Sequence, residues 1–278
     1  MASAAATRWK ISILILRPKD MRYWYQKPHH KLSDYVRTVL VADMLADDAD
    51  PNVPFFVAGM PAVFVQLSPV EGQQAGDVTV TLFGTAVPPD FRLSDRHTIV
   101  LSYFFMPFAL ACLFDLPARA MTKGPIDVDD WNKREAIRLK SLLSDSPTPT
   151  NLLGVLDKFF IELLNKHHHA CEAIRMATDK IMLDPDADQL NQLPDQFHLT
   201  RRTFQRMFKK YVGISATEYR RICQFQQSFQ QVRTRQFDKL SDVAVDNGFA
   251  DQSHFVRSFR EFAQTTPGKY LDEGLQPK

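Results

Sequence analysis

Hydrophobic and polar residues follow different patterns in the two halves of the chain. The first half contains short runs rich in Val, Ile, Phe and Thr, separated by Pro and Gly, which predict β-strands. The predicted strands cover residues 11–16, 55–57, 63–67, 78–83 and 99–105. Segment 34–45 fits either a helix or a strand, and residues 108–114 and 130–143 fit helices. An α+β domain is therefore expected over residues 1–150.

The next segment, residues 151–166, predicts a connecting helix with Asn151 as its N-cap. Leu152, Phe159 and Leu163 form one apolar stripe, and Leu153 and other apolar residues lie beside it. A helix with so wide an apolar face must bury it. It can pack on its own domain or form a dimer interface, and the sequence leaves both alternatives open.

The second half of the chain predicts helices only, and it repeats itself with an offset of 51 residues. Five aromatic or hydroxyl positions of one copy recur in the other. They are Phe204, Phe208, Tyr211, Ser215 and Tyr219, which match Phe255, Phe259, Phe262, Thr266 and Tyr270. Such a repeat indicates two copies of one supersecondary unit.

Each copy has the pattern of a helix-turn-helix. In the second copy, Gly248 ends a short helix and Asp251 caps the next one. In the first copy Thr200 takes the capping position, and Pro194 is expected to distort or shorten the leading helix.

The side chains opposite the buried aromatic stripe are suited to DNA. Arg pairs with guanine, Gln pairs with adenine, and a Val methyl contacts thymine in the major groove. The candidate base-reading residues are Arg201, Arg202, Gln205 and Arg206 in the first unit, and Gln252, Ser253, Val256 and Arg257 in the second. The candidate phosphate contacts, further from the helix start, are Lys209, Lys210 and Arg260.

The charge distribution agrees with this interpretation. The net charge is only +2, but residues 201–235 contain nine basic residues and one acid, Glu218. Local positive charge of this kind suits a polyanion, and a solvated basic face is the alternative.

The stretch from Leu240 to Tyr270 resembles the signature segment of the AraC/XylS family of bacterial transcription regulators. The matching features are Val243-Ala244, Gly248-Phe249, Gln252-Ser253, Phe255, Phe259, Thr266-Pro267 and Tyr270, with Arg206, Phe208–Lys210 and Gly213 in the first copy. The resemblance implies a DNA-binding domain over residues 167–278, with one long helix at about 217–235 joining the two units. Gln264 and Ala216 depart from the family pattern in turns.

The first half is similar to the sensor-like domain that precedes this module in one branch of the family. The similar stretches are Lys27–Leu32, Tyr35-Val36 and residues 108–114 followed by Leu116. The resemblance implies a domain for sensing or dimerisation, often a cupin-like barrel.

These observations predict a sequence-specific transcription regulator whose partner is double-stranded operator or promoter DNA. RNA polymerase, a small-molecule effector and a second copy of the chain are further expected partners. No membrane segment, cofactor or catalytic residue is expected, and His167–His169 are not expected to bind metal because neighbouring helical residues diverge. The three scattered cysteines predict no disulfide, and with no signal peptide recognised they indicate a cytoplasmic location. An enzyme-like N-terminal barrel fused to the DNA module, and an architectural DNA binder, remain alternatives.

Overall fold

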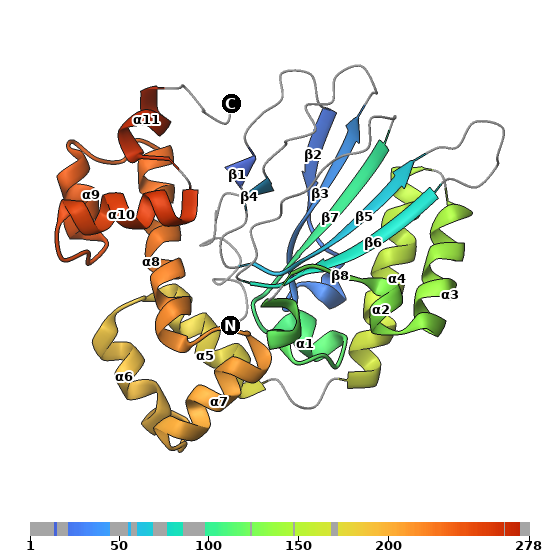
Figure 1. The fold of residues 1–278 in the computed structure, drawn as a ribbon, viewed down its shortest axis with the longest axis horizontal. Helices are drawn as coiled ribbons and strands as arrows, with labels where there is room; N and C mark the ends of the chain where they lie inside the picture. Colours follow the sequence, from blue (N-terminus) through green and yellow to red (C-terminus); the bar gives the residue numbers. More distant parts are fainter. Residues whose placement is uncertain are drawn as a thin grey trace.

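The computed structural model of the chain describes residues 14–15, 22–44, 55–56, 60–68, 77–85, 98–122, 124–146, 148–167, 172–263 and 265–272. The chain builds an antiparallel sheet with flanking helices, followed by a region made of helices alone (Figure 1). Gln264, one of the two departures from the family pattern, and His168–His169 lie outside the described residues.

The main sheet has six antiparallel strands in the order β2-β3-β7-β5-β6-β8. Their bounds are Arg22–Gln26, Val36–Met44, Thr98–Phe105, Ala62–Ser68, Asp77–Phe83 and Ile126–Asp127, and a separate pair joins β1, Leu14–Ile15, to β4, Phe55–Phe56. The ambiguous segment 34–45 is therefore a strand. The six strands form an open sheet with β2 and β8 at its edges, so the described strands give an α+β domain without barrel closure.

Among the described residues, five helices come between β7 and the helical region, and the last three pack against β6 or β7 of the sheet. These are α1, Ala109–Leu113, the 3-10 helix η3, Ala118–Thr122, α2, Val128–Trp131, α3, Lys133–Ser144, and α4, Pro149–His167. The single helix expected over 130–143 is interrupted at Asn132, which is extended (φ −153°) and caps α3 by accepting a hydrogen bond from the Glu135 amide.

Helix α4 packs on the sheet through its wide apolar face. The Phe160 ring lies 5.0 Å from that of Tyr103 and 5.2 Å from that of Phe105, measured between centroids. The Tyr103 hydroxyl donates to Asp157 Oδ1 at 2.9 Å. Leu152, Leu156, Phe159, Phe160 and Leu163 are buried. The apolar face is thus buried within the chain, as the first of the two alternatives predicted.

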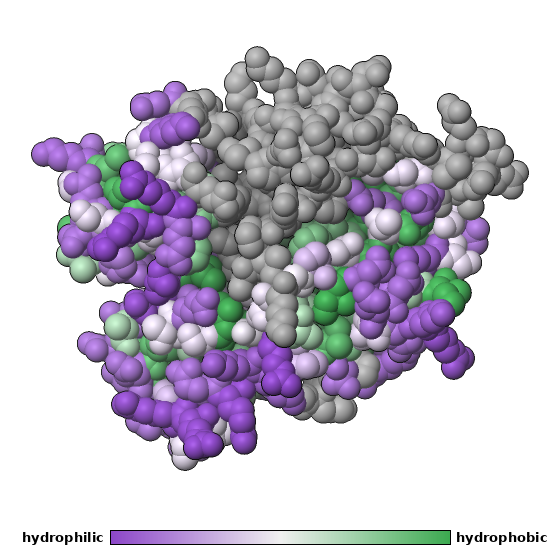
Figure 2. All heavy atoms as spheres, in the orientation of Figure 1, coloured by the Kyte–Doolittle hydropathy of each residue, from purple (hydrophilic) through white to green (hydrophobic). Residues whose placement is uncertain are grey.

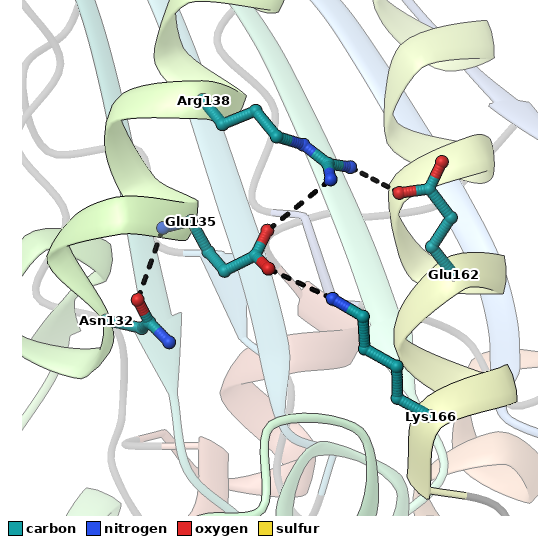
Figure 3. Close-up of polar contacts among 5 residues, drawn as sticks. All are labelled: Asn132, Glu135, Arg138, Glu162 and Lys166. Carbon is teal, nitrogen blue, oxygen red and sulfur yellow. Dashed lines mark hydrogen bonds and ion pairs between the residues drawn. The ribbon is translucent and has the colours of Figure 1, made fainter.

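Ion pairs fasten α3 to α4 on the outer side (Figure 3). Lys166 Nζ lies 3.0 Å from Glu135 Oε1, and Arg138 contacts both Glu162 and, at 3.8 Å, Glu135 Oε2. The hydrogen bond from Lys166 holds the pKa of Glu135 below its ordinary value. The two helices therefore form one unit with the sheet.

The helical region contains seven helices among the described residues. They are α5, Glu172–Leu183, α6, Ala187–Gln196, α7, Arg201–Tyr211, α8, Ala216–Arg233, α9, Leu240–Asp246, α10, Gln252–Ala263, and α11, Pro267–Asp272. Helix α8 runs between the group α5–α7 and the group α9–α11 (Figure 1). It is the long joining helix implied by the family resemblance, two residues shorter at its end than expected.

The cysteines do not match the sequence expectation. Cys112, on α1, is disulfide-bonded, whereas Cys223, on α8, is free and buried. The prediction of no disulfide is therefore wrong, and the argument from cysteines for a reducing compartment is lost. Among the described residues, no helix is both long and apolar enough to cross a membrane.

Candidate DNA-binding surface

The first helix-turn-helix consists of α6 and α7. Asp186 caps α6, and Pro194 lies in its last turn, so the helix keeps ten residues despite the proline. His198 makes the turn with a positive φ of 53°, a conformation in which His is tolerated better than most side chains. Thr200 then accepts a hydrogen bond from the Thr203 amide at 3.2 Å, which confirms it as the N-cap of α7.

The second helix-turn-helix consists of α9 and α10. Gly248 has a φ of +69° after α9, as predicted for a left-handed position at a helix end. Asp251 Oδ1 accepts a hydrogen bond from the His254 amide at 2.6 Å, which confirms the predicted cap of α10. Each unit thus has a residue of positive φ after its first helix, two residues before the cap Thr200 in the first unit and three residues before the cap Asp251 in the second.

The buried positions of the two units confirm the repeat. Helices α7 and α10 begin at residues 201 and 252, which are 51 apart. Phe204 and Phe255 are buried at matching positions, as are Phe208 and Phe259, and Tyr219 and Tyr270. Because both helices turn the same face inward, both turn the same face outward.

The outward faces carry the residues predicted to contact DNA. Arg201, Arg202, Gln205, Arg206, Lys209 and Lys210 on α7 are exposed, as are Gln252, Ser253, Arg257 and Arg260 on α10, while Val256 is half-buried. Hydrophilic side chains gather over α6 and α7 in the lower left of the surface view (Figure 2). The structure therefore places the predicted residues on the two outer helix faces.

The basic residues of this region divide into two groups. Arg220 donates to the Pro185 carbonyl, Arg221 forms an ion pair with Glu261 at 2.6 Å, and Arg233 donates to Gln230. The first two contacts fasten α8 to its neighbours, and the third lies within α8 itself. By contrast, Arg201, Arg202, Arg206 and Lys209 form no ion pair within the part of the chain that the structure describes. The free charge is thus concentrated on α7.

Two sets of contacts that position these helices cannot be recognised from the local sequence pattern. Glutamines on α8 donate to the ends of α5 and α9, and α7 packs against η3 of the sheet domain. A glutamine inside a long polar helix looks like a solvent-facing residue, so only the burial of Gln224 reveals its role. The contact between α7 and η3 joins segments about 90 residues apart, which no local pattern encodes.

Comparison with known proteins agrees with this architecture. Residues 193–273 match a family model described as a helix-turn-helix domain. A probable transcription factor, PqrA of Proteus vulgaris, is 32% identical over 73 residues, which are 26% of this chain and 59% of the relative. The match thus covers less than two thirds of that relative.

Solved structures of ToxT from Vibrio cholerae are similar over most of the chain. One covers 93% of this chain and 99% of ToxT, with a TM-score of 0.42 and 13% identity. A structure of ToxT bound to an unsaturated fatty acid covers 93% and 97% with the same TM-score and identity. The family model thus identifies residues 193–273, which include α7, α9 and α10, as a helix-turn-helix domain.

Proposed function

We propose that the protein is a sequence-specific transcription regulator that binds double-stranded DNA through α7 and α10. The observation that carries the proposal is the pairing of two capped helices, each with aromatic residues buried on one face and Arg, Gln or Ser exposed on the other. A helix-turn-helix inserts such a face into the major groove.

The proposal gives the exposed residues two roles. Arg201, Arg202, Gln205 and Arg206 read bases from α7, and Gln252, Ser253, Val256 and Arg257 read bases from α10. Lys209, Lys210 and Arg260 lie one turn or more further along and bind phosphates, which position the protein without reading sequence. The half-buried state of Val256 fits an apolar contact with a thymine methyl.

We assign residues 1–150 the role of a sensing or assembly domain and residues 167–278 that of the DNA reader. What supports control by the first domain is its direct contact with the first unit. A Cβ added to Gly213, just after α7, would lie 3.0 Å from Thr122 Cγ2 and 3.2 Å from the Ala118 backbone, both in η3. If an effector moved η3, the position of α7 would therefore change with it.

A second contact between the domains lies at Arg37 of β3. Its guanidinium contacts Met182 Sδ of α5 at 3.5 Å, and burial lowers its pKa.

Control by dimerisation has a weaker basis, because the apolar face of segment 151–166 is buried within the chain. An unsaturated fatty acid bound to ToxT shows that one similar protein takes an apolar acid, and we propose a small molecule as the effector here. RNA polymerase would be the partner at a promoter.

The test is selection of duplexes from a random pool by the full-length chain, followed by titration of the enriched duplex and a scrambled duplex at about 0.15 M salt. We expect the enriched duplex to bind at least about 10³-fold more tightly. Equal affinity for both duplexes would favour an architectural DNA binder, and no binding would remove the DNA role altogether.

A further inference from the structure

Helix α8 is the structural element shared by the two reading units. Tyr219 and Ile222, in its first half, belong to the core that contains α7, whereas Phe225 and Phe229, in its second half, belong to the core of α9–α11. The angle between α7 and α10 therefore depends on how firmly each unit is held to this one helix (Figure 1).

Gln224 holds the second unit at the end of α9. Its side chain is only 3% exposed, and its Nε2 donates to the carbonyls of Asn247 at 2.9 Å and Gly248 at 2.8 Å. A side-chain amide has two N–H donors, and both are used here. Carbonyls that follow a helix lack intrahelical partners, so this amide supplies what the turn would otherwise need from water.

Gln227, one turn further along α8, makes the same arrangement with α5, which lies against the first unit. Its Nε2 donates to the carbonyls of Met182 at 3.1 Å and Leu183 at 3.4 Å, at the end of α5. Helix α5 packs against both α6 and α7. Two neighbouring amides of α8 thus each bridge two consecutive carbonyls, one pair in the second unit and one pair in α5, which packs against the first unit.

Two further hydrogen bonds hold the second unit to α8. Asn247 Nδ2 donates to Gln231 Oε1 at 2.6 Å, and Gln231 Nε2 donates to Asp246 Oδ2 at 2.8 Å. Hydrogen bonds are directional, unlike the apolar contacts of the two cores, so they resist rotation of one unit about α8. The glutamines therefore define an angle that packing alone leaves softer.

We infer that Gln224 and Gln227 set the spacing of the DNA site by fixing α7 relative to α10. Inserting one base pair moves a groove contact by about 3.4 Å and turns it by about 34–36° around the duplex axis. A rigid pair of units cannot follow that movement and loses one contact, whereas a loose pair can follow it. The inference rests on the proposed function, because it needs both helices to contact one duplex.

The experiment uses the full-length chain and the duplex enriched by selection, with one base pair inserted or removed between its two footprinted segments. For the natural sequence we expect affinity to fall about tenfold or more for either change. Gln224→Met and Gln227→Met keep the side-chain length but remove the donors. We expect each variant to lose less than about threefold on the altered duplexes relative to its own best duplex.

Two measurements separate positioning from loss of structure. Gln192→Met, an exposed glutamine of α6, is the matched control and should keep the natural spacing profile. A duplex that carries only the segment bound by α7 should bind the natural chain and the variants equally. If Gln224→Met fails to fold, the half-buried Gln227→Met carries the test.

The outcomes are distinct. A flattened spacing profile with unchanged binding of the single-segment duplex supports the inference. An unchanged profile in folded variants, or an equal loss at every spacing, overturns it while the proposed function stands. If the natural chain enriches no duplex, the proposed function fails, and the inference fails with it.

Discussion

The two helix-turn-helix units share a design but belong to different cores. Phe204 and Phe208 of the first unit lie in the same apolar cluster as Tyr103 and Phe105 of the sheet. Phe255 and Phe259 of the second unit belong to a separate cluster around the end of α8, and the partly buried Phe262 packs against both clusters. The two units therefore repeat in sequence but are packed differently in the fold.

The asymmetry teaches where a signal from the sheet domain could arrive. The first unit touches α1 and η3 directly, whereas the second is held mainly through α8. A change in the sheet domain would thus shift α7 first, and α10 would respond through the joining helix. It also means that residues 167–278, taken alone, would expose the apolar surface that α7 now buries against η3.

The largest expected effect compares the two buried phenylalanines at matching positions. Phe208→Ala and Phe259→Ala should each lower the free energy of unfolding by about 3–5 kcal/mol, because both side chains are fully buried. The segments that each substitution destabilises should differ. Hydrogen exchange should accelerate in β7 and α1 for Phe208→Ala, but only in α8–α11 for Phe259→Ala.

Denaturant unfolding followed by circular dichroism measures the free energy of unfolding, and hydrogen-exchange mass spectrometry shows which segments are destabilised. If Phe259→Ala exposes the strands as strongly as Phe208→Ala does, the two units unfold together with the sheet, and the separation into two cores has no energetic meaning.

The second comparison concerns two glycines. Gly213 follows the last helix of the first unit, and Gly248 follows the first helix of the second unit. Both have positive φ, +89° at Gly213 and +69° at Gly248, so Ala costs about 1–2 kcal/mol at either position. At Gly213 the new Cβ would also press on η3, whereas at Gly248 the nearest atom is Gln224 Nε2 at 3.7 Å. We expect Gly213→Ala to cost at least about 1 kcal/mol more in thermal or denaturant unfolding.

The contact itself can be tested in a double variant. Thr122→Ser removes Cγ2 but keeps the hydroxyl that donates to the Arg119 carbonyl. It should recover part of the loss in Gly213→Ala and nothing in Gly248→Ala. Equal costs at the two glycines, with no recovery, would show that η3 does not restrain the first unit.

The helical half was predictable because its signals are local. Thr200 and Asp251 cap their helices as expected, and the aromatic residues repeat at positions that are all buried or half-buried. The prediction was wrong at the start of α4, where Thr148 and Asn151 are both residue types that can cap a helix. Helix α4 begins at Pro149 after Thr148, whose hydroxyl accepts from the Asn151 amide, so Asn151 is inside the helix and is not its cap.

The features that could not be predicted depend on distant partners. Nothing near Gly213 in the sequence indicates Thr122, and nothing near Gln224 indicates the carbonyl of Gly248. The disulfide of Cys112 likewise depends on the folded chain. For the candidate site, the sequence identified the outward residues of α7 and α10, while the contacts that orient those helices appeared only in three dimensions.

A third comparison concerns base reading. Arg206→Ala and Arg257→Ala occupy matching positions, 51 residues apart, and both side chains are exposed. Each should weaken binding to the enriched duplex by about 1–3 kcal/mol and relax preference at one or two base pairs. Repeating the selection with each variant locates those base pairs. A uniform loss on all sequences would place that arginine on phosphate.

The smallest expected effect concerns charge. Helix α7 carries Arg201, Arg202, Arg206, Lys209 and Lys210 with no acid, whereas α10 carries Arg257 and Arg260 after the cap Asp251. The remaining acid of α10, Glu261, is paired with Arg221 of α8. Phosphate binding releases counterions, so each phosphate neutralised adds about 0.9 to the slope of log K against log salt concentration. The first unit should therefore supply most of the salt dependence.

Titrations of one duplex between about 0.05 and 0.2 M salt would measure this slope. Lys209→Ala/Lys210→Ala should flatten it by up to about 2, and Arg260→Ala by at most about 1. The two lysines differ in their contacts, because the Lys210 ammonium donates to the Tyr211 hydroxyl at 3.1 Å and lies over that ring. Lys209→Ala alone separates the two lysines, and Gln192→Met leaves charge unchanged. If Arg260→Ala flattens the slope as much as the double variant does, the second unit is the main electrostatic anchor, and the sheet domain then contacts the unit that matters less for affinity.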